Sequence, residues 1–505
     1  MIRRLKGILY AGATVILMLC TAGIDAKDIK ALQKRPNIIM FLVDDMGWQE
    51  TSVPFYSEVT ELNKRYHTPN MDRLASRGMK FTQAYACAVC SPSRISLNTG
   101  LNAARHRVTT WTLRKNKSPE PNHKTLIPPE WNVNGICTEP GIERTTVVKM
   151  LPQILQENGY KTIHSGKAHF GAKGTPGESP LNLGFDVNIA GHAAGGPGSY
   201  YAKNNFSAEF RNGDRIWDIP GLEKYHGTDL YLNEVLTIEA NKEIDKAVKE
   251  NKPFYLYMSH YAIHAPWEKD FRFYEKYKAM GLTDFQASYA SMVESMDKSL
   301  GDLMQNIRRH GIEDNTIILF LSDNGQPKNT DRNLPLRGHK LTPYEGGVRV
   351  PMIVYWPEVT KPHSICDNYV IIEDFFPTIL EMAGVSEYEQ VGGVIDGESF
   401  VQYIKGNAEK QQTRPIFWHY PNTYDQPPYS SVRVGDWKLI YQHVQQDLEL
   451  YNLKSDIAET TNMATNEPVK LKEMAGILSD FLRESEAQLP VNKKTKKIIP
   501  YPDEL

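Results

Sequence analysis

The chain has 505 residues, of which 41% are hydrophobic and 23% are charged. This composition is typical of a globular protein rather than a disordered one, and the length allows a large core and more than one structural unit. The formal net charge is −2. A nucleic-acid-binding surface needs a strongly basic face, so we expect no nucleic-acid partner.

The N-terminus has the layout of a secretory signal peptide. MIRRLKG carries positive charge, the apolar segment ILYAGATVILMLCTAGI follows, and small residues continue up to Ala26. We therefore expect residues 1–26 to be a signal peptide and the mature protein to be exported, either periplasmic or secreted. An uncleaved anchor is an alternative, because the apolar run approaches ~18 residues. A lipid anchor at Cys20 is another, and it is the only membrane contact that we expect, although Leu19 replaces the usual small residue.

Four cysteines remain after the signal peptide: Cys87, Cys90, Cys137 and Cys366. Four cysteines in so long an exported chain do not make a disulfide scaffold. At least one of them is therefore expected to serve another purpose.

The next 380 or so residues alternate between strand and helix patterns. PNIIMFLVDD reads as a buried parallel strand, and TPNMDRLASRGMKF as an amphipathic helix with Leu74 and Met79 on its apolar side. VVKMLPQILQENGYKTIHSGKAHFG repeats the plan, with Gly159 near the end of its helix. Later come NKPFYLYMSHYAIHAP, ASYASMVESMDKSLGDLMQNIRRHG, TIILFLSDNG and EDFFPTILEMAGV. This alternation predicts an α/β fold in which helices sandwich a large, mostly parallel sheet, over residues 27–410.

Residues 411–505 have a different pattern. IFWHYP, SSVRVGDWKLIYQ and LELYNL are short alternating strands, and KLKEMAGILSDFLRESEAQ is a helix. They predict a smaller C-terminal subdomain with an antiparallel sheet. GHAAGGPGSYY (191–201) is a flexible loop rather than a phosphate cradle, because it has no GxGxxG or P-loop spacing.

Acidic residues follow two of the predicted strands. Asp44 and Asp45 end the first strand, and Asp323 and Asn324 follow TIILFLS. Ligands collect outside the carboxyl ends of strands in open α/β sheets, and carboxylate and amide oxygens are ligands of hard divalent cations. The alternative is that both pairs are turn residues.

The segment CSPSRISLNTG (90–100), which we expect in a loop, resembles the signature of the formylglycine-dependent sulfatases, within the alkaline-phosphatase-like superfamily. The similarity continues in the family's order through NIIMFLVDDMG, GYKTIHSGKAHFG, PFYLYMSHYAIHAPW, FLSDNG, LRGHKLTPYEGGVRVP, DFFPTILEMAGV and LYNLKSDIAETTNMA. The resemblance implies that a maturation enzyme oxidises Cys90 to formylglycine. An aldehyde hydrate has one hydroxyl to attack sulfur and a second that expels sulfate by re-forming the aldehyde.

The resemblance also implies roles for individual residues. Asp44, Asp45, Asp323 and Asn324 match the family's metal ligands, completed by the modified Cys90; calcium is implied, and magnesium stays possible. The matching catalytic residues are Arg94, which braces the aldehyde hydrate, and Lys167, His169, His264 and Lys340 around the sulfate. His264 would be the acid for the leaving oxygen, assisted by Lys340, and His169 would help to release sulfate. Candidate substrate-binding residues are His192, Arg332 and His419.

The chain thus resembles exported bacterial carbohydrate sulfatases. We expect exo-action on a terminal sulfated sugar, galactose or hexosamine, in a sulfated glycan. One alternative is a phosphate or phosphonate ester hydrolase, because the same fold and metal site suit both tetrahedral anions. The other is a non-catalytic glycan-binding protein on this fold, which an unmodified Cys90 would favour.

Overall fold

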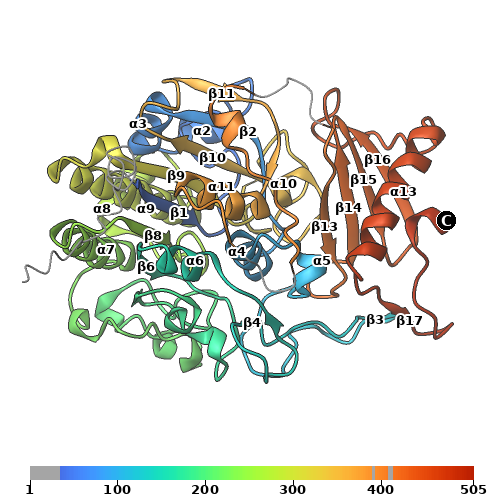
Figure 1. Cartoon of the computed structure of the whole chain (residues 1–505), viewed down its shortest axis with the longest axis horizontal. Coiled ribbons are helices and arrows are strands. Elements are labelled where there is room, and N and C mark those ends of the chain that lie inside the picture. Colours follow the sequence, from blue (N-terminus) through green and yellow to red (C-terminus); the bar gives the residue numbers. More distant parts are fainter. Residues whose placement is uncertain (1–34, 332, 389–392, 408–412) are drawn as a thin grey trace, which may run out of the picture. The chain divides into compact units, whose positions relative to one another are not determined.

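A sheet of nine strands lies at the centre of the computed structural model, with helices on both faces (Figure 1). The structure describes residues 35–331, 333–388, 393–407 and 413–505, and Pro36–Leu505 form one compact unit. The predicted signal peptide (1–26), with Cys20, lies outside the described residues. Among those described, no helix is both long and apolar enough to cross a lipid bilayer.

The central sheet is mostly parallel, as predicted. β10 runs antiparallel to both of its neighbours, and the other strand pairs are parallel. Strands such as TIILFLS are buried along their whole length, because helices cover both faces and leave no side for polar alternation. In spatial order the strands are β11 (Ser364–Cys366), β2 (Met79–Tyr85), β10 (Arg349–Tyr355), β9 (Thr316–Ser322), β1 (Asn37–Val43), β8 (Phe254–Ser259), β6 (Lys161–Gly166) and β7 (Val187–Ile189), with β12 (Val370–Ile371) beside β2.

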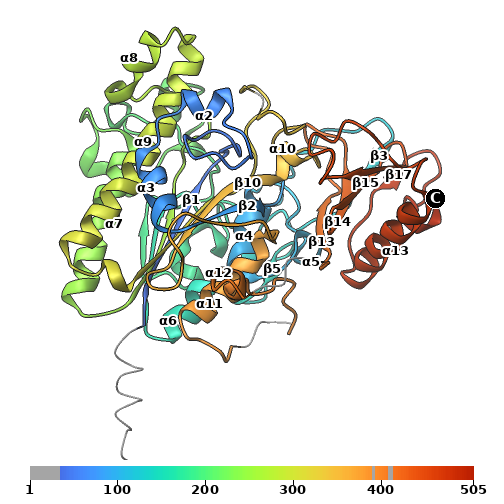
Figure 2. The ribbon, with the colours of Figure 1, turned by 90° about the horizontal axis from the view of Figure 1, so that it is seen from above.

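Two groups of helices enclose this sheet (Figures 1 and 2). One face carries α3 (Pro69–Arg77), α7 (Leu232–Lys249), α8 (Phe271–Ala279) and α9 (Asp284–Arg309). The other carries α4 (Cys90–Thr99), α6 (Leu151–Glu157) and α11 (Phe375–Met382). Each group buries its own apolar cluster against the sheet. Shorter elements are α2 (Glu61–Arg65), α5 (Ala103–His106), α10 (Glu345–Val348), α12 (Val401–Ile404), β3 (Leu126–Ile127), β4 (Ile136–Cys137), β5 (Thr146–Val147) and β17 (Val491–Asn492).

The prediction of a loop at CSPSRISLNTG is wrong, because Cys90–Thr99 form helix α4. Val89, in an extended conformation, precedes its first turn. Gly100 ends it with φ 71°, a left-handed conformation that glycine adopts without strain, and its N–H donates to the carbonyl of Ser96. All ten helical residues are buried, so tertiary packing outweighs the weak helix propensity of the Cys-Ser-Pro-Ser start.

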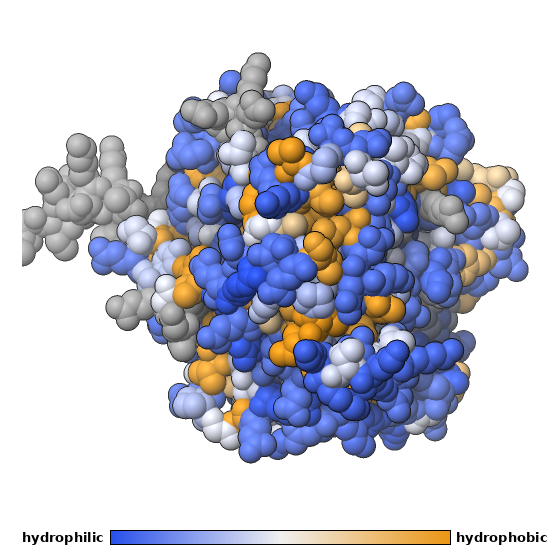
Figure 3. Space-filling view, turned by 90° about the vertical axis from the view of Figure 1, so that its right-hand side faces the viewer, coloured by the Kyte–Doolittle hydropathy of each residue, from blue (hydrophilic) through white to orange (hydrophobic). Residues whose placement is uncertain are grey.

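The C-terminal part forms a separate four-stranded antiparallel sheet, as predicted. Its strands are β13 (Ile416–Tyr420), β14 (Tyr429–Val434), β15 (Trp437–Gln442) and β16 (Asp447–Asn452), in that spatial order. Helix α13 (Pro468–Glu484) packs against the sheet through an apolar cluster that includes Leu439 and Leu478. The side of the protein that carries α13 is mainly hydrophilic, with apolar side chains in smaller groups between the polar ones (Figure 3). The boundary at residue 410 stays a prediction.

Candidate active site

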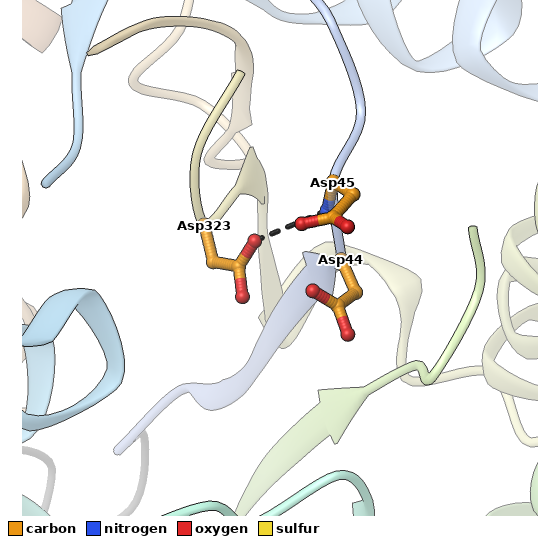
Figure 4. A group of neighbouring side chains, drawn as sticks. All are labelled: Asp44, Asp45 and Asp323. Atoms are coloured by element: carbon orange, nitrogen blue, oxygen red, sulfur yellow. Dashed lines mark hydrogen bonds between the residues drawn. The ribbon is translucent and has the colours of Figure 1, made fainter. Parts of the chain in front are cut away.

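Three carboxylates meet where β1 and β9 end (Figure 4). The two strands pair in parallel with Val43 opposite Ser322, so Asp44 and Asp45 emerge beside Asp323. The backbone N–H of Asp45 donates to Oδ1 of Asp323 at 3.1 Å. One ligand oxygen from each of the three carboxylates lies within 4.8 Å of the others. The strand-end argument from the sequence therefore brings the predicted residues together.

The donor set fits a hard divalent cation. Oδ1 of Asp44 and Oδ1 of Asn324 are buried and have no hydrogen-bond partner among the described residues. Burial, followed by the charge of Asp323, holds the pKa of Asp44 well above its usual range. A calcium or magnesium ion would coordinate these unpartnered oxygens and would stabilise the buried charge of Asp44.

Each carboxylate also has a cationic partner. Lys167 Nζ lies 2.6 Å from Oδ2 of Asp44, and Arg94 Nη2 lies 2.6 Å from Oδ2 of Asp323. Lys340 Nζ lies 2.5 Å from Oδ1 of Asp45. Burial alone would raise the pKa of Asp45, but Lys340, His264 and Lys167 together outweigh burial and the pKa is lowered. Burial would lower the pKa of Lys340, but Asp45 and the other acidic groups around it together raise that pKa.

Cys90 is the first residue of α4 and is only 3% exposed. Burial raises the pKa of its thiol, although the charges of Lys167 and Lys340 oppose the effect. The N-terminus of α4 adds partial positive charge at this position. The surroundings therefore suit an anion that approaches residue 90, rather than a reactive thiolate.

A cavity of about 450 Å³ opens above Cys90. Its polar lining includes five of the residues predicted from the sequence: Asp45, Cys90, His169, His264 and Lys340. These side chains come from five separate segments and converge on one space. The residues predicted from the sequence as nucleophile, acid–base groups and cations thus share a single cavity.

The two cavity histidines are fixed by backbone carbonyls. Nδ1 of His264 donates to the carbonyl of Ala265 at 2.8 Å, which leaves Nε2 on the side of Asp45, 4.0 Å from Oδ2. Nε2 of His169 donates to the carbonyl of Thr112 at 2.8 Å, and its buried Nδ1 has no partner among the described residues. Burial lowers the pKa of His264 to about 3 and that of His169 well below its usual value. Both rings are therefore neutral before an anion binds.

The Gly-rich loop of residues 191–201 packs its backbone against both rings. A Cβ at Gly195 would lie 2.5 Å from Cε1 of His169, and one at Gly196 would lie 2.7 Å from Nδ1 of His264. Any other residue at these two positions would displace a cavity histidine. The loop therefore positions the two cavity histidines, and this role of the loop was not evident from the sequence.

Other predicted residues lie outside the cavity lining. Arg94 is fully buried and pairs with Asp323, and Lys167 is fully buried and pairs with Asp44. His192 is buried beside His169, to whose N–H its carbonyl is bonded at 3.2 Å. Both ring nitrogens of His419 are engaged, with Ser430 Oγ at 2.9 Å and the carbonyl of Gln488 at 3.1 Å. Arg332 lies outside the described residues.

Aromatic residues form much of the remaining cavity wall, and they could not be placed individually from the sequence. They are Trp111, Trp217, Trp267 and Tyr424. Trp111 and Tyr424 pack edge to face with ring centroids 5.3 Å apart. These residues come from distant parts of the chain without a shared motif, so only the fold reveals that they act together.

This mostly parallel sheet with an acidic site at its strand ends is the alkaline-phosphatase-like fold of hydrolases. A family model described as sulfatase matches residues 36–385, and a model described as the C-terminal part of N-sulphoglucosamine sulphohydrolase matches residues 339–488. The chain belongs to the sulfatase family and is a sulfuric ester hydrolase.

Relatives and solved structures agree with this assignment. A sulfatase of Formosa agariphila is 29% identical, with 94% of this chain and 93% of that protein covered. The N-acetylgalactosamine-6-sulfatase of Mus musculus is 30% identical, with 80% and 71% covered. The crystal structure of Ps i-CgsB superposes with a TM-score of 0.73 at 26% identity, covering 90% of this chain and 94% of the other.

Proposed function

We propose that the protein is an exported carbohydrate sulfatase that removes the sulfate monoester of a terminal galactose or hexosamine. The observation that carries the proposal is the convergence of Cys90, His169, His264 and Lys340 beside Asp45 in one cavity. The Mus musculus relative is named for N-acetylgalactosamine 6-sulfate, and Ps i-CgsB has also been crystallised with k-i-k-neocarrahexaose. Both names support a sulfated sugar as the substrate.

Position 90 and the acidic cluster would carry the two groups that this chemistry uses. The clustered Asp44, Asp45 and Asp323, together with Asn324 and the modified Cys90, would hold one divalent cation, and the family resemblance favours calcium over magnesium. When bound, the cation would supply charge stabilisation to the sulfate oxygens. A formylglycine made from Cys90 by a maturation enzyme would supply a hydrated aldehyde as a self-releasing nucleophile.

The remaining residues bind the sulfate and move protons. Lys340, already charged through its contact with Asp45, faces the cavity and attracts the sulfate. Nε2 of His264 faces the cavity because Nδ1 is held by a carbonyl, and this atom delivers a proton to the leaving sugar oxygen once an anion is bound. Nδ1 of His169 accepts a proton from the side chain at position 90. Arg94 and Lys167 hold the carboxylates in place.

The dimensions and walls of the cavity favour a single sugar unit. A volume of about 450 Å³ lies within the range of small-molecule sites, ~300–1,000 Å³. The aromatic wall offers flat apolar surfaces to the C–H faces of a pyranose ring. Terminal sulfated sugars therefore fit better than the middle of a long chain.

A panel of position-defined sulfated mono- and disaccharides, assayed for sulfate release, tests the proposal. The protein should be produced together with a formylglycine-generating enzyme, and phosphate and phosphonate esters should be included. Release of sulfate from at least one sugar, at a rate well above that of phosphate from the matched ester, is the expected result. Preference for the phosphate or phosphonate ester, or binding without turnover, contradicts it.

A further inference from the structure

A second cavity, of about 940 Å³, lies directly beside the first. The two share Pro327 and Lys328 in their linings. The second cavity contains none of the residues that the sequence or the sulfatase chemistry assigns to catalysis. Because the linings share Pro327 and Lys328, the two cavities adjoin each other.

Two hydrogen bonds connect the segments that border the two cavities. The N–H of Lys340 donates to the carbonyl of Gln326 at 2.8 Å, and Nε2 of Gln326 donates to the carbonyl of Gly338 at 3.3 Å. Lys340 borders the catalytic cavity, whereas Gly338 and His339 border the second one. A molecule that is anchored at Lys340 and extends past Lys328 therefore enters the second cavity.

The far wall of the second cavity is held in place before any ligand binds. It is formed by residues 458–460, which follow the C-terminal sheet. Arg337 reaches across with Nη1 bonded to the carbonyl of Glu459 at 2.9 Å and to the hydroxyl of Tyr451 at 3.1 Å. Its guanidinium lies 3.7 Å from the centre of the Tyr344 ring. A preformed wall lowers the entropic cost of binding.

The charge of this cavity is basic. Lys328 and Arg337 line it, and among the described residues the ammonium of Lys328 has no ion pair. The acidic residue in the lining, Glu459, turns its carboxylate into the protein, where it is fully buried and lies 2.9 Å from Lys438. His339 adds an imidazole whose Nδ1 is held by the carbonyl of Lys340.

We propose that the second cavity binds an anionic sugar, sulfated or uronic, that neighbours the terminal sugar whose sulfate enters the catalytic cavity. This inference rests on the proposed function and narrows the substrate to a polyanionic oligosaccharide. Selectivity comes from the unpaired charge of Lys328 and from the basic lining, because a neutral neighbour gains neither contact. A sulfate group and a carboxylate satisfy the same site, so the test includes both.

The experiment compares kcat/KM for one hydrolysed sulfated sugar presented alone and in three disaccharides. The neighbouring unit is neutral in the first disaccharide, a uronate in the second and a sulfated sugar in the third. At low ionic strength we expect an anionic neighbour to raise kcat/KM by about 10–100-fold over the neutral one. Equal values for all three neighbours would overturn the proposal.

Two matched substitutions place the effect in the second cavity. Thr460 lines this cavity and not the catalytic one, so Thr460→Glu adds a repelling charge there. Thr460→Glu should abolish most of the preference for an anionic neighbour, while Thr460→Gln, of the same size, should keep it. The exposed Lys124 provides a control for overall charge, and Lys124→Glu should keep the preference. Retention of the full preference in Thr460→Glu would also contradict the proposal.

Binding decides the matter separately from turnover. Calorimetric titration of the Cys90→Ala variant with the same disaccharides measures affinity without hydrolysis. We expect the affinity for the anionic disaccharides to be higher than that for the neutral one by a factor of about 10 or more. Adding Thr460→Glu should remove this difference in affinity. If the wild-type protein, matured at Cys90, released no sulfate from any of these sugars while the variant kept this binding pattern, only the proposed function would be contradicted. Equal affinities would contradict the second-cavity proposal alone.

Discussion

The ammonium of Lys167 lies 2.6 Å from a carboxylate oxygen of Asp44, and both side chains are fully buried. Asp45 and Asp323 are paired in the same way, with Lys340 and Arg94. Three negative charges thus face three positive ones, which permits so dense an acidic cluster inside the protein. A bound divalent cation would make this site net positive, a suitable environment for a sulfate group.

The first prediction concerns residue 90. Co-production with a maturation enzyme should give a peptide in which sulfur is exchanged for oxygen and two hydrogens are lost, as seen by mass spectrometry. Cys90→Ala should lower turnover by about 10³-fold or more, because the nucleophile is removed. Cys87, which is buried in the apolar cluster and absent from the cavity lining, is the control. Full activity with an intact thiol at residue 90 would refute the mechanism.

The second prediction concerns the metal. Asp323→Asn removes one of the three clustered carboxylates, and we expect the bound divalent metal to be lost when elemental analysis is performed on the purified variant. Asp302→Asn is the matched control, because Asp302 is a partly exposed acid of α9 paired with Lys298. Dialysis against a chelator should lower the melting temperature of the wild type and leave that of Asp323→Asn unchanged. Full metal occupancy in Asp323→Asn would remove this residue from the ligand set.

Sequence reasoning predicted the part of the site that depends on local pattern. Asp44 and Asp323 could be paired because buried parallel strands end at one edge of a sheet. Trp111 and Trp267 could not be placed, because their contacts depend on how distant loops fold together. The helix at Cys90 was missed for a related reason, since its stability comes from burial of every residue rather than from propensity. The antiparallel strand β10 was also missed inside an otherwise parallel pattern.

The third prediction separates leaving-group chemistry from charge. His264→Ala should lose about 10²–10⁴-fold more activity on a sugar sulfate than on an aryl sulfate, because only the sugar alkoxide requires a proton as it leaves. Lys167→Ala should reduce both activities to a similar extent, since Lys167 contacts Asp44 and does not line the cavity. The measurement is kcat/KM for both variants on both substrates. Equal losses for His264→Ala would make it a sulfate-binding residue instead of the acid.

The fourth prediction concerns pH and the C-terminal sheet. His443 Nε2 donates to Ser430 Oγ, the Ser430 hydroxyl donates to Nδ1 of His419, and Nε2 of His419 donates to the carbonyl of Gln488. This chain requires neutral rings, and burial lowers the pKa of His419 to about 4. The folded pKa is below the unfolded one, so the stabilising contribution is complete above about pH 6.5 and is lost as the pH falls towards 4.

The pH prediction is measured by urea unfolding of the wild type and of His419→Gln. Because the variant lacks the titrating ring, the stability gap between the two proteins should narrow by about 3 kcal/mol from pH 7 to pH 4. His363→Gln, at an exposed position, serves as the control and should show a constant gap. A gap for His419→Gln that stays constant with pH would show that the ring is protonated in the folded protein.

The last prediction concerns a buried charge network between the catalytic part and the C-terminal sheet. Lys438 Nζ lies 2.8 Å from Glu345 and 2.9 Å from Glu459, and all three side chains are fully buried. Lys438→Met would leave Glu459 without its cation, which should lower the free energy of unfolding by about 3–5 kcal/mol in urea titrations at pH 7. The surface pair of Lys470 and Glu473 is the control, and Lys470→Met should cost less than about 1 kcal/mol.

The pH dependence of the Lys438→Met defect distinguishes lost charge pairing from lost packing. Burial already raises the pKa of Glu459 to about 7, and removal of Lys438 should raise it further. A carboxyl group whose pKa is raised in the folded protein stabilises folding at low pH, and this stabilisation is lost as the pH rises. The loss of unfolding free energy caused by Lys438→Met should therefore grow between pH 6 and pH 9. Adding Glu459→Gln to Lys438→Met removes the unpaired charge and should flatten this dependence. A defect of the same size at every pH would show that Lys438 contributes by packing and not by charge.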